Sequence, residues 1–553
     1  MYLRTTTSRP RTDGSVVRYL QLAHNAWDPA AGCAKARVLY NFGREDRLDR
    51  AAIARLVTSL SRLLEPGAAL AAAAPTELTF VDARPMGGAY VLDRLWRRLG
   101  LDRLLDGLLA ERRLDAGAER VLFALVANRA LEPLSKLAAT RWVAERVALP
   151  GLEEVSDDAC YRAMDWLLAI ESQLAEQVYW AVADLLNLEV DLLFFDTSST
   201  YFEIEQPDAP GEGETVGFRS HGHSKDHRPD LPQVVIGLAV TRTGIPIRVW
   251  TWPGNTNDSA LIRKVKDDLR AWRLGRVVWV ADRGFQSAEN RRYLQRAGGH
   301  YLLGERLRSG SKEAAAALAR QGRYHTVAGN LRVKEVVIDD GVMRDRFVVC
   351  HNPEQAARDK AVRDQLLAQL RDAIADSDRL EPDERAKLAA ELRAHPGYRR
   401  LLRTTPKGRL RINRASVSTE ARLDGKFLLR TSDPTLSAED VALGYKQLLE
   451  VERAWRDMKS TLELRPVYHR LEDRIRAHVL LCWLALLLIW VAERRTGLTW
   501  RRIGIELGRV HAVTLTGSAG SLVHLTPLNT AQTGILRDCQ VPPPATVTAL
   551  HPT

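Results

Sequence analysis

Apolar and polar positions follow different periods along successive stretches of this 553-residue chain, and each change predicts a new kind of element. Residues 1–80 hold short strand-like runs and then one helical segment, which predicts an N-terminal α+β segment. Residues 81–187 carry apolar side chains at spacings of three and four, the pattern of amphipathic helices. Several of these helices have Arg-bearing faces. The region is either a DNA-binding domain that includes a helix-turn-helix or a helical packing domain.

The pattern changes near residue 188, where strands begin to alternate with helices. Runs such as VDLLFFDTSSTYFEIE and QVVIGLAVTRTGIPIRVW are rich in β-branched and aromatic residues and are bounded by polar turns. Two helical segments and two further strands complete the stretch to residue 305. A mixed α/β layer, with helices packed on a sheet, is the architecture this order predicts.

The α/β pattern breaks off over residues 306–432, which read as an insertion of strands and a charged helical pair. Helical periodicity returns over residues 433–495. Within it, the apolar run VLLCWLALLLIWVA is too short to span a bilayer and predicts a buried helix, so no membrane association is expected. Residues 496–553 form a C-terminal segment whose end, VPPPATVTALHPT, is predicted to be flexible.

Charge and cysteine content narrow the class of protein. The chain has 80 Lys and Arg against 69 Asp and Glu, a net charge of +11, which favours a polyanionic partner. Charge alone does not distinguish DNA from RNA or an acidic membrane surface. The five cysteines are isolated, which argues against a disulfide framework or a zinc ribbon and indicates a reducing compartment. A cytoplasmic, nucleic-acid-associated protein is expected.

Three carboxylates occupy positions that suit metal chemistry. Asp196 lies in the first predicted strand, Asp282 ends the strand VVWVADRG, and Glu452 lies on a helix after the insertion. If the two strands are neighbours and the helix crosses the sheet, the carboxylates gather and repel one another unless divalent cations bind. Oxygen ligands suit Mg²⁺ or Mn²⁺. Two such ions can promote in-line attack on a phosphodiester, which predicts a metal-dependent DNA-cutting enzyme.

The stretch YKQLLEVERAWRDMKSTLELRP is predicted to be one helix that carries Tyr445, Glu452 and Lys459 at seven-residue intervals. Seven residues span about 10.5 Å of helix, so the three side chains share one face. Taken alone, this face is either a solvated surface or a row of functional groups.

The chain resembles a known family at these positions. Its order of elements is similar to the ribonuclease-H-like fold, and FFDTSSTYFE and ADRGF resemble the segments that carry the first two catalytic Asp residues of the DDE transposases of the IS4 superfamily, most nearly the IS1634-like branch. The family signature Y-x2-R-x3-E-x6-K is matched at Tyr445, Glu452 and Lys459. Leu448 stands where the family has Arg, and Arg453 and Arg456 on the same helix are the candidates to replace it.

The resemblance implies a fold, a function and a site. Residues 188–305 and 433–495 would form a ribonuclease-H-like catalytic domain in which Asp196, Asp282 and Glu452 hold two Mg²⁺ (or Mn²⁺) ions. The DNA contacts would come from Tyr445, Lys459, Arg453 and Arg456. It also implies cut-and-paste transposition by a bacterial, nucleoid-associated protein that acts as a homodimer on double-stranded DNA, at its terminal inverted repeats and at target DNA.

Two other functions remain open at this point: a ribonuclease-H-like nuclease without strand transfer, and a catalytically silent, sequence-specific DNA-binding protein. Two local features also have alternative readings. His221, His223 and His227 are expected to belong to a polar loop near the DNA rather than to a metal site. Trp250 and Trp252 are expected in the core, with stacking on an unpaired base as the alternative.

Overall fold

The computed structural model separates the chain into two units, one made of residues 84–510 and 528–543, the other of residues 1–83, 511–527 and 544–553. The residues that the structure describes are 1–8, 16–29, 31–61, 78–110, 117–186, 192–211, 213, 215–270, 272, 276–308, 310–339, 344–517 and 520–552.

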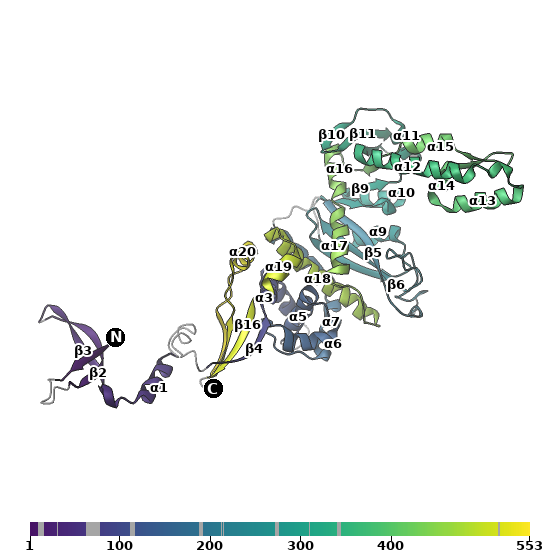
Figure 1. The fold of residues 1–553 in the computed structure, drawn as a ribbon. Helices are drawn as coiled ribbons and strands as arrows, with labels where there is room; N and C mark the ends of the chain where they lie inside the picture. The colour runs from purple at the N-terminus through teal and green to yellow at the C-terminus, as the bar shows by residue number, and fades with distance from the viewer. Residues whose placement is uncertain are drawn as a thin grey trace. The chain divides into compact units, whose positions relative to one another are not determined.

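A mixed sheet forms the centre of the larger unit (Figure 1). Within the described residues it has nine strands in the order β10-β11-β12-β15-β9-β8-β5-β6-β7. β5 pairs in parallel with β8, and β8 in parallel with β9, while the remaining pairs are antiparallel. The strands are β5 (Leu192–Tyr201), β6 (Gln233–Thr241), β7 (Pro246–Pro253), β8 (Val278–Ala281), β9 (His300–Glu305), β10 (His325–Ala328), β11 (Leu331–Asp339), β12 (Arg344–His351) and β15 (Lys426–Thr431).

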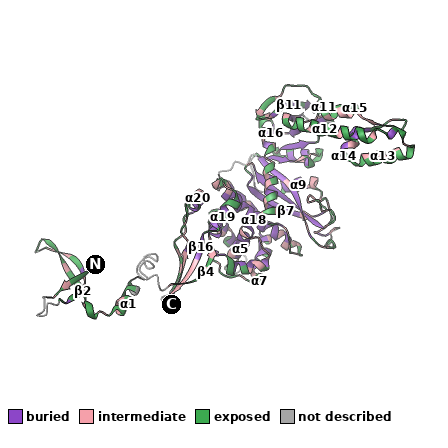
Figure 2. Ribbon diagram, viewed as in Figure 1, coloured by how far each residue is buried: buried purple, intermediate pink, exposed green. Residues whose placement is uncertain are grey.

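The central strands are buried on both faces, which explains their continuous apolar sequences. Every residue of β6 and of β8 is buried, and β5 is exposed only in part at two positions, one of which is Asp196. Figure 2 shows the buried residues concentrated in these strands. α9 (Asp258–Arg270) connects β7 to β8, while η4 (Arg283–Phe285), α10 (Ala288–Gln295) and η5 (Arg296–Gly298) connect β8 to β9. The mixed α/β layer predicted from the sequence is thus present.

The predicted insertion differs from the structure in one respect. Its strands β10, β11, β12 and β15 continue the central sheet, because β15 pairs with β9. β11 is buried at alternate positions, a pattern that looks the same in a separate sheet and at the edge of a larger one. A group of helices and one hairpin has its own small core, which includes Leu370 and Leu410. The elements of the insertion's helical part are α11 (Lys312–Ala319), α12 (Pro353–Ile374), η6 (Ser377–Arg379), α13 (Pro382–Ala394), α14 (Pro396–Leu401), β13 (Leu402–Thr404), β14 (Leu410–Ile412) and α15 (Arg414–Ala421).

Three helices then return across the sheet. α16 (Ala438–Lys446) contacts β9, β11, β12 and β15, and α17 (Leu449–Ser460) contacts β5 and β6. α18 (Glu472–Thr496) packs against β7, α17 and the helices α3, α5 and α7. By length and composition α18 would pass as a membrane span, but its apolar stretch is buried inside the unit. It is the buried core helix that the sequence predicted.

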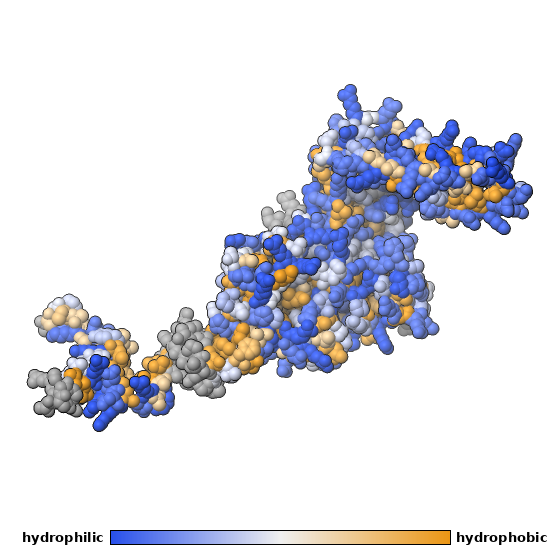
Figure 3. All heavy atoms as spheres, in the orientation of Figure 1, coloured by the Kyte–Doolittle hydropathy of each residue, from blue (hydrophilic) through white to orange (hydrophobic). Residues whose placement is uncertain are grey.

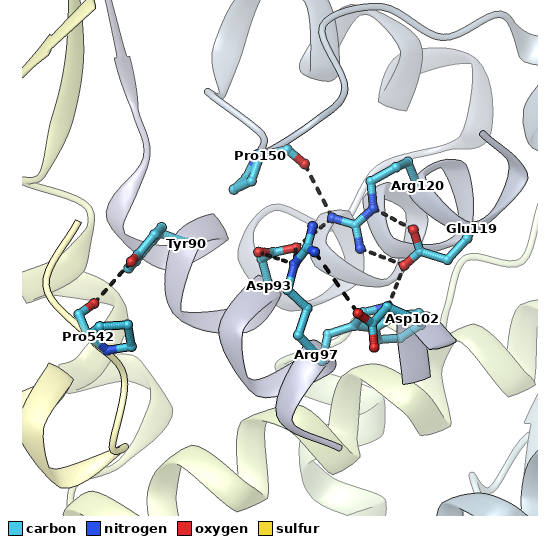
Figure 4. A network of polar contacts seen from close by, with 9 residues as sticks. Tyr90, Asp93, Arg97, Asp102, Glu119, Arg120, Pro150 and Pro542 are labelled. Carbon is cyan, nitrogen blue, oxygen red and sulfur yellow. Dashed lines mark hydrogen bonds and ion pairs between the residues drawn. The ribbon is translucent and has the colours of Figure 1, made fainter. Parts of the chain in front are cut away.

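The N-terminal helices of this unit pack around α18 rather than standing apart from it. α5 is buried on nearly all sides, which suits a packing role. Figure 4 shows the polar network between these helices, in which Arg120 of α5 pairs with Asp93 and with Glu119. The unit presents a mainly hydrophilic surface in Figure 3. These helices, and two from later in the chain, are α3 (Gly87–Arg98), α4 (Leu101–Ala110), α5 (Ala118–Leu131), α6 (Lys136–Arg141), η3 (Trp142–Arg146), α7 (Asp157–Ala169), α8 (Glu171–Leu186), α19 (Trp500–Leu507) and α20 (Thr530–Asp538).

The smaller unit contains two sheets in the part of the chain that the structure describes. One has the order β1-β2-β3 and the other the order β18-β17-β16-β4. The C-terminal tail was predicted to be flexible, but its last residues form β18 and pair with β17. The segment before this strand is rich in Pro, which suggested a flexible tail and gave no indication of a paired strand. The elements are β1 (Tyr2–Thr7), β2 (Arg18–Asp28), β3 (Cys33–Arg44), η1 (Glu45–Arg47), α1 (Arg50–Ser61), β4 (Thr79–Pro85), β16 (His511–Gly517), β17 (Gly520–Leu525) and β18 (Val547–Pro552).

Candidate active site

Asp196 and Asp282 lie opposite each other on neighbouring parallel strands. Phe195 of β5 is in register with Ala281 of β8, and each Asp is the next residue along its chain. Because paired strands run about 4.8 Å apart, the two carboxyl groups leave the sheet side by side. The sequence predicted this arrangement on the condition that the two strands are neighbours, and the structure confirms that they are.

The carboxyl group of Asp196 is on the face of the sheet that α16 and α17 cross. Leu192 of β5 packs against Gly444 of α16. Side chains alternate along a strand, so Asp196, four residues further on, points to the same face as Leu192. α17 crosses β5 and β6 on its way and carries Glu452. The three predicted carboxylates therefore come from the middle of β5, the residue after β8, and α17.

Tyr445, Glu452 and Lys459 do not lie on one helix, which corrects the prediction from sequence. Tyr445 is near the end of α16, whereas Glu452 and Lys459 are on α17. Between the helices the N–H of Leu448 donates to the carbonyl of Tyr445 at 3.0 Å, a bond to the third preceding residue that tightens the chain. No Pro or Gly marks this junction, so the apolar periodicity gave no sign of a break.

The phenol of Tyr445 lies against the backbone of Gly304 in β9. A Cβ atom at position 304 would be 2.3 Å from the phenol oxygen, so only glycine leaves room for this ring. Both residues line a cavity of about 560 Å³ together with Asp282. Burial raises the pKa of Tyr445, and the charge of Asp282 raises it further. Tyr445 is thus a neutral phenol packed beside the second Asp.

The Asp196 carboxyl group has an unfavourable environment for its charge. Burial raises its pKa to about 6, and the charges of Asp282 and Asp258 act in the same direction. Lys225 opposes the shift. A carboxylate whose ionised form is disfavoured in this way gains stability from any cation that binds beside it.

Lys225 occupies the space between the acidic residues. Its Nζ donates to the carbonyl and to the hydroxyl of Thr197 at 2.5 and 2.6 Å, lies 3.1 Å from Asp258 Oδ2, and lies 3.8 Å from Asp196 Oδ1. Asp258 is in the first turn of α9, so this ammonium group joins the middle of β5 to the start of a helix. The site therefore holds a fourth carboxylate and its own protein cation.

The next residue, Asp226, connects the same loop to α17. Lys459 Nζ donates to Asp226 Oδ1 at 2.8 Å, and Arg465 Nη1 lies 3.6 Å from Asp226 Oδ2. Lys459, predicted to contact DNA, is engaged with the protein. Adjacent residues of one loop thus bind the first Asp strand through Lys225 and the Glu452 helix through Asp226.

The Arg residues proposed to replace the family Arg differ in their surroundings. Arg453 forms an ion pair with Glu493 and stacks over the ring of Trp490, 5.0 Å from its centroid. Arg456 is exposed, whereas Leu448 packs against the core. Arg453 therefore joins α17 to α18, and Arg456 is the one with a side chain available at the surface.

The remaining candidates do not join the carboxylates. His221, His223 and His227 are exposed, as expected for a polar loop. Trp250 is buried and its indole N–H donates to Asp268 at 2.8 Å, while Trp252 stacks beside it. These tryptophans belong to the core around α9.

The donor set fits a hard divalent cation. Asp196, Asp282 and Glu452 offer only oxygen ligands, which Mg²⁺ and Mn²⁺ prefer. Among the described residues, no three His, Cys, Asp or Glu side chains are close enough together to hold an ion as they stand. The position of Lys225 shows that the carboxylates of Asp196 and Asp258 already stabilise a positive charge.

Sequence reasoning missed Lys225, Asp226 and Asp258. Lys225 and Asp226 lie in the polar loop of His221, His223 and His227, and Asp258 is in the first turn of α9. In the sequence Lys225 and Asp226 lie between His residues of a polar loop. In the structure they are less exposed than those His residues, because the loop folds back. Only the long-range contacts with Thr197 and Lys459 reveal this.

Replacing Lys225 by Met should destabilise the metal-free protein, because Asp196 and Asp258 lose their shared cation and Thr197 loses a donor. The expected loss is about 1–3 kcal/mol in EDTA, measured by urea unfolding. Mn²⁺ should restore part of it. Lys264→Met, at an exposed position of α9, is the control and should behave as wild type. Equal stability of Lys225→Met and wild type in EDTA would contradict the assigned contacts.

Comparison with known protein families agrees with the arrangement of the site residues. Residues 202–488, more than half of the chain, match the family described as transposase DDE domain. The chain therefore belongs to the DDE transposases. Residues 3–71 match the IS1634 family transposase N-terminal domain, so within that class the chain is IS1634-like, as the sequence motifs predicted. The large mixed sheet fits a ribonuclease-H-like transposase core. The family normally uses divalent metal ions, in agreement with the oxygen-only donor set.

Solved structures with detectable similarity include a piggyBac transposase synaptic complex with hairpin DNA, at 11% identity and a TM-score of 0.34, covering 72% of this chain and 73% of that one. A Mos1 transposase paired-end complex has 14% identity and a TM-score of 0.13, covering 35% of this chain and 55% of that one. Comparison with curated proteins gave no match.

Proposed function

We propose that this transposase cleaves DNA at the terminal inverted repeats of its own insertion sequence and joins the released 3′ ends to target DNA. Membership of the DDE transposase family supports transposition in general. The observation that supports the specific chemistry is that Asp196 of β5 and Asp282, directly after β8, follow paired residues of neighbouring parallel strands, while Glu452 is on α17, which contacts β5 and β6.

The residues divide the work as follows. Asp196, Asp282 and Glu452 would hold the divalent ions, Mg²⁺ or Mn²⁺ and two per site, which supply activation of a water or a 3′ hydroxyl and stabilise the leaving oxygen. Asp282 is fixed in orientation because its carboxylate accepts the N–H of Gly284. Tyr445 packs beside Asp282 and lines the same cavity.

The DNA strand would be held by the cationic side of α17. Arg456 is exposed there and can form the phosphate contact that Leu448 cannot make. Lys459 would exchange Asp226 for a phosphate when DNA binds, and Tyr445 would face the same strand. Arg453, tied to Glu493, would position α17. Two DNA ends must be brought together, so we propose a homodimer on double-stranded DNA in the bacterial cytoplasm.

The test is a cleavage and joining assay on a labelled duplex that carries the ends of the flanking element, with Mg²⁺ or Mn²⁺. A duplex of shuffled sequence is the control. Cutting at the repeats followed by joining to a target plasmid is the expected result. Cutting without joining would favour a nuclease without strand transfer. Specific binding without any cutting would favour a catalytically silent DNA-binding protein.

A further inference from the structure

A second cavity lies away from the carboxylates, between α5, α6, α7, α18 and the loop that follows α17. Its volume is about 590 Å³. We call it the Lys136 pocket, and its polar lining consists chiefly of Arg129, Lys136, Tyr161, Tyr468, His469 and His478.

Two buried cations line this pocket without a carboxylate partner. Lys136 is 3% exposed and Arg129 is 4% exposed. In the described part of the chain, Arg129 donates only to backbone carbonyls, those of Leu134, Leu462 and Glu463, and its Nε has no partner. No hydrogen bond or ion pair to a described residue satisfies Lys136 Nζ. A buried cation without a counter-charge is costly, so these positions are unexpected for a purely structural role.

The opposite end of α5 carries an Arg that is only partly buried and yet has carboxylate partners. Arg120 lies between Asp93 and Glu119 and forms ion pairs with both at 2.5 Å (Figure 4). In the Lys136 pocket the single acidic lining residue is Glu463, which is exposed and whose backbone carbonyl, rather than its carboxylate, is the acceptor from Arg129. The Arg at one end of α5 thus has carboxylate partners, whereas Arg129 at the other end has none among the described residues.

The titratable groups in the pocket respond to this excess of positive charge. Burial, together with the charge of Arg129, lowers the pKa of Lys136 to about 7. Burial and Lys136 lower the pKa of His469 to about 4. His478 is 3% exposed, its Nε2 contacts the carbonyl of Leu464 at 3.1 Å, and its Nδ1 has no partner among the described residues. Each group would gain from an anion in the cavity.

We propose that the Lys136 pocket binds a phosphate group, held by the guanidinium of Arg129 and the ammonium of Lys136. Arg129 contributes a fixed positive charge, although its Nη groups already donate to backbone carbonyls, and Lys136 adds a compact ammonium group that can donate to phosphate oxygens. The cavity is much larger than one phosphate, and the aromatic rings of Tyr161 and Tyr468 leave space for a group attached to it. The phosphate is either free or part of a nucleic-acid strand, and only the second source rests on the proposed function.

Binding of inorganic phosphate to the metal-free protein in EDTA tests the pocket without any DNA cleavage. ³¹P NMR titration at constant ionic strength should show binding to wild type, and Lys136→Met should weaken it about 10- to 100-fold, the loss of one charge-assisted contact. Lys264→Met, on the surface of α9, should bind as wild type. Absence of phosphate binding to wild type, or equal binding to Lys136→Met, would overturn the proposal.

Thermal unfolding is a second test, because a phosphate-binding role and a purely structural role of Lys136 predict opposite effects of Lys136→Met on the unfolding temperature. In chloride buffer Lys136→Met should unfold at a higher temperature than wild type, because a buried unpaired charge is removed, whereas phosphate should stabilise only wild type. A lower unfolding temperature of Lys136→Met in chloride would contradict the assignment.

Competition with a 5′-phosphorylated trinucleotide then identifies the source of the phosphate. Displacement of inorganic phosphate supports a nucleic-acid strand, and no displacement supports free phosphate. Because no cutting is measured, failure here leaves the transposition test unaffected.

Discussion

Replacing Asp282 by Asn, or Glu452 by Gln, should abolish metal-dependent cleavage of the element ends while DNA binding is retained. Each change keeps the size of the side chain and removes the negative charge that a divalent ion requires. The expected loss in cleavage rate is at least about 10³-fold, as for other residues that act as one catalytic unit. Cleavage of a labelled duplex in Mg²⁺ and a gel-shift assay on the same duplex measure the two properties separately.

The structure supplies a matched control for this pair. Glu450 is on the same helix as Glu452, but its carboxylate lies 3.3 Å from Arg494 and close to the turn at Gly244. Glu450→Gln should therefore cut DNA at nearly the wild-type rate. Asp282→Asn retains the acceptor for the N–H of Gly284, so its local fold should persist. Equal cutting by Glu452→Gln and wild type would remove Glu452 from the site.

Much of the catalytic layer could be predicted because its signals are local. The apolar runs of β5, β6 and β8 reflect burial on both faces, and acidic residues stand out against them, Asp196 within β5 and Asp282 directly after β8. Pairing of β15 with β9 could not be read from the sequence, because the apolar pattern of a strand carries no information about which strand pairs with it. The C-terminal strand β18 was missed for the same reason: its partner β17 is separated from it by a helix.

The candidate site was predictable only as far as its residues belong to motifs. The spacing of Tyr445, Glu452 and Lys459 suggested one helix, but a tightened turn at Leu448 places Tyr445 on a separate helix, against Gly304. Apolar periodicity indicates which face of a helix is buried. It gives no sign of a turn between two helices when the apolar spacing continues across that turn. Lys225 acts through contacts with residues distant in sequence, and such contacts leave no local pattern.

Replacing Arg430 by Met should have the largest effect on stability. Arg430, in β15, is 1% exposed and forms ion pairs with Asp345 and, at 3.5 Å, with Glu305. Without it these two buried carboxylates face each other, while Arg291 lies 3.8 Å from Glu305. Removing one partner of a buried ion pair costs about 3–5 kcal/mol, which we expect as the loss in the free energy of unfolding by urea.

The pH dependence of this loss separates an electrostatic cause from a packing defect. Burial already raises the pKa of Glu305, and the loss of Arg430 should raise it further. A carboxyl with a raised pKa in the folded state binds protons more readily there than in the unfolded chain, so the variant should regain stability as the pH falls from 7 towards 5. Arg379→Met, which removes an exposed ion pair with Asp376, should cause no measurable change at either pH. A loss for Arg430→Met that is the same at pH 5 and pH 7 would indicate a packing defect instead.

Because Glu305 follows Gly304 directly in β9, an electrostatic loss should also disturb the packing of Tyr445 beside Asp282, and cleavage by the variant should fall under conditions in which it remains folded.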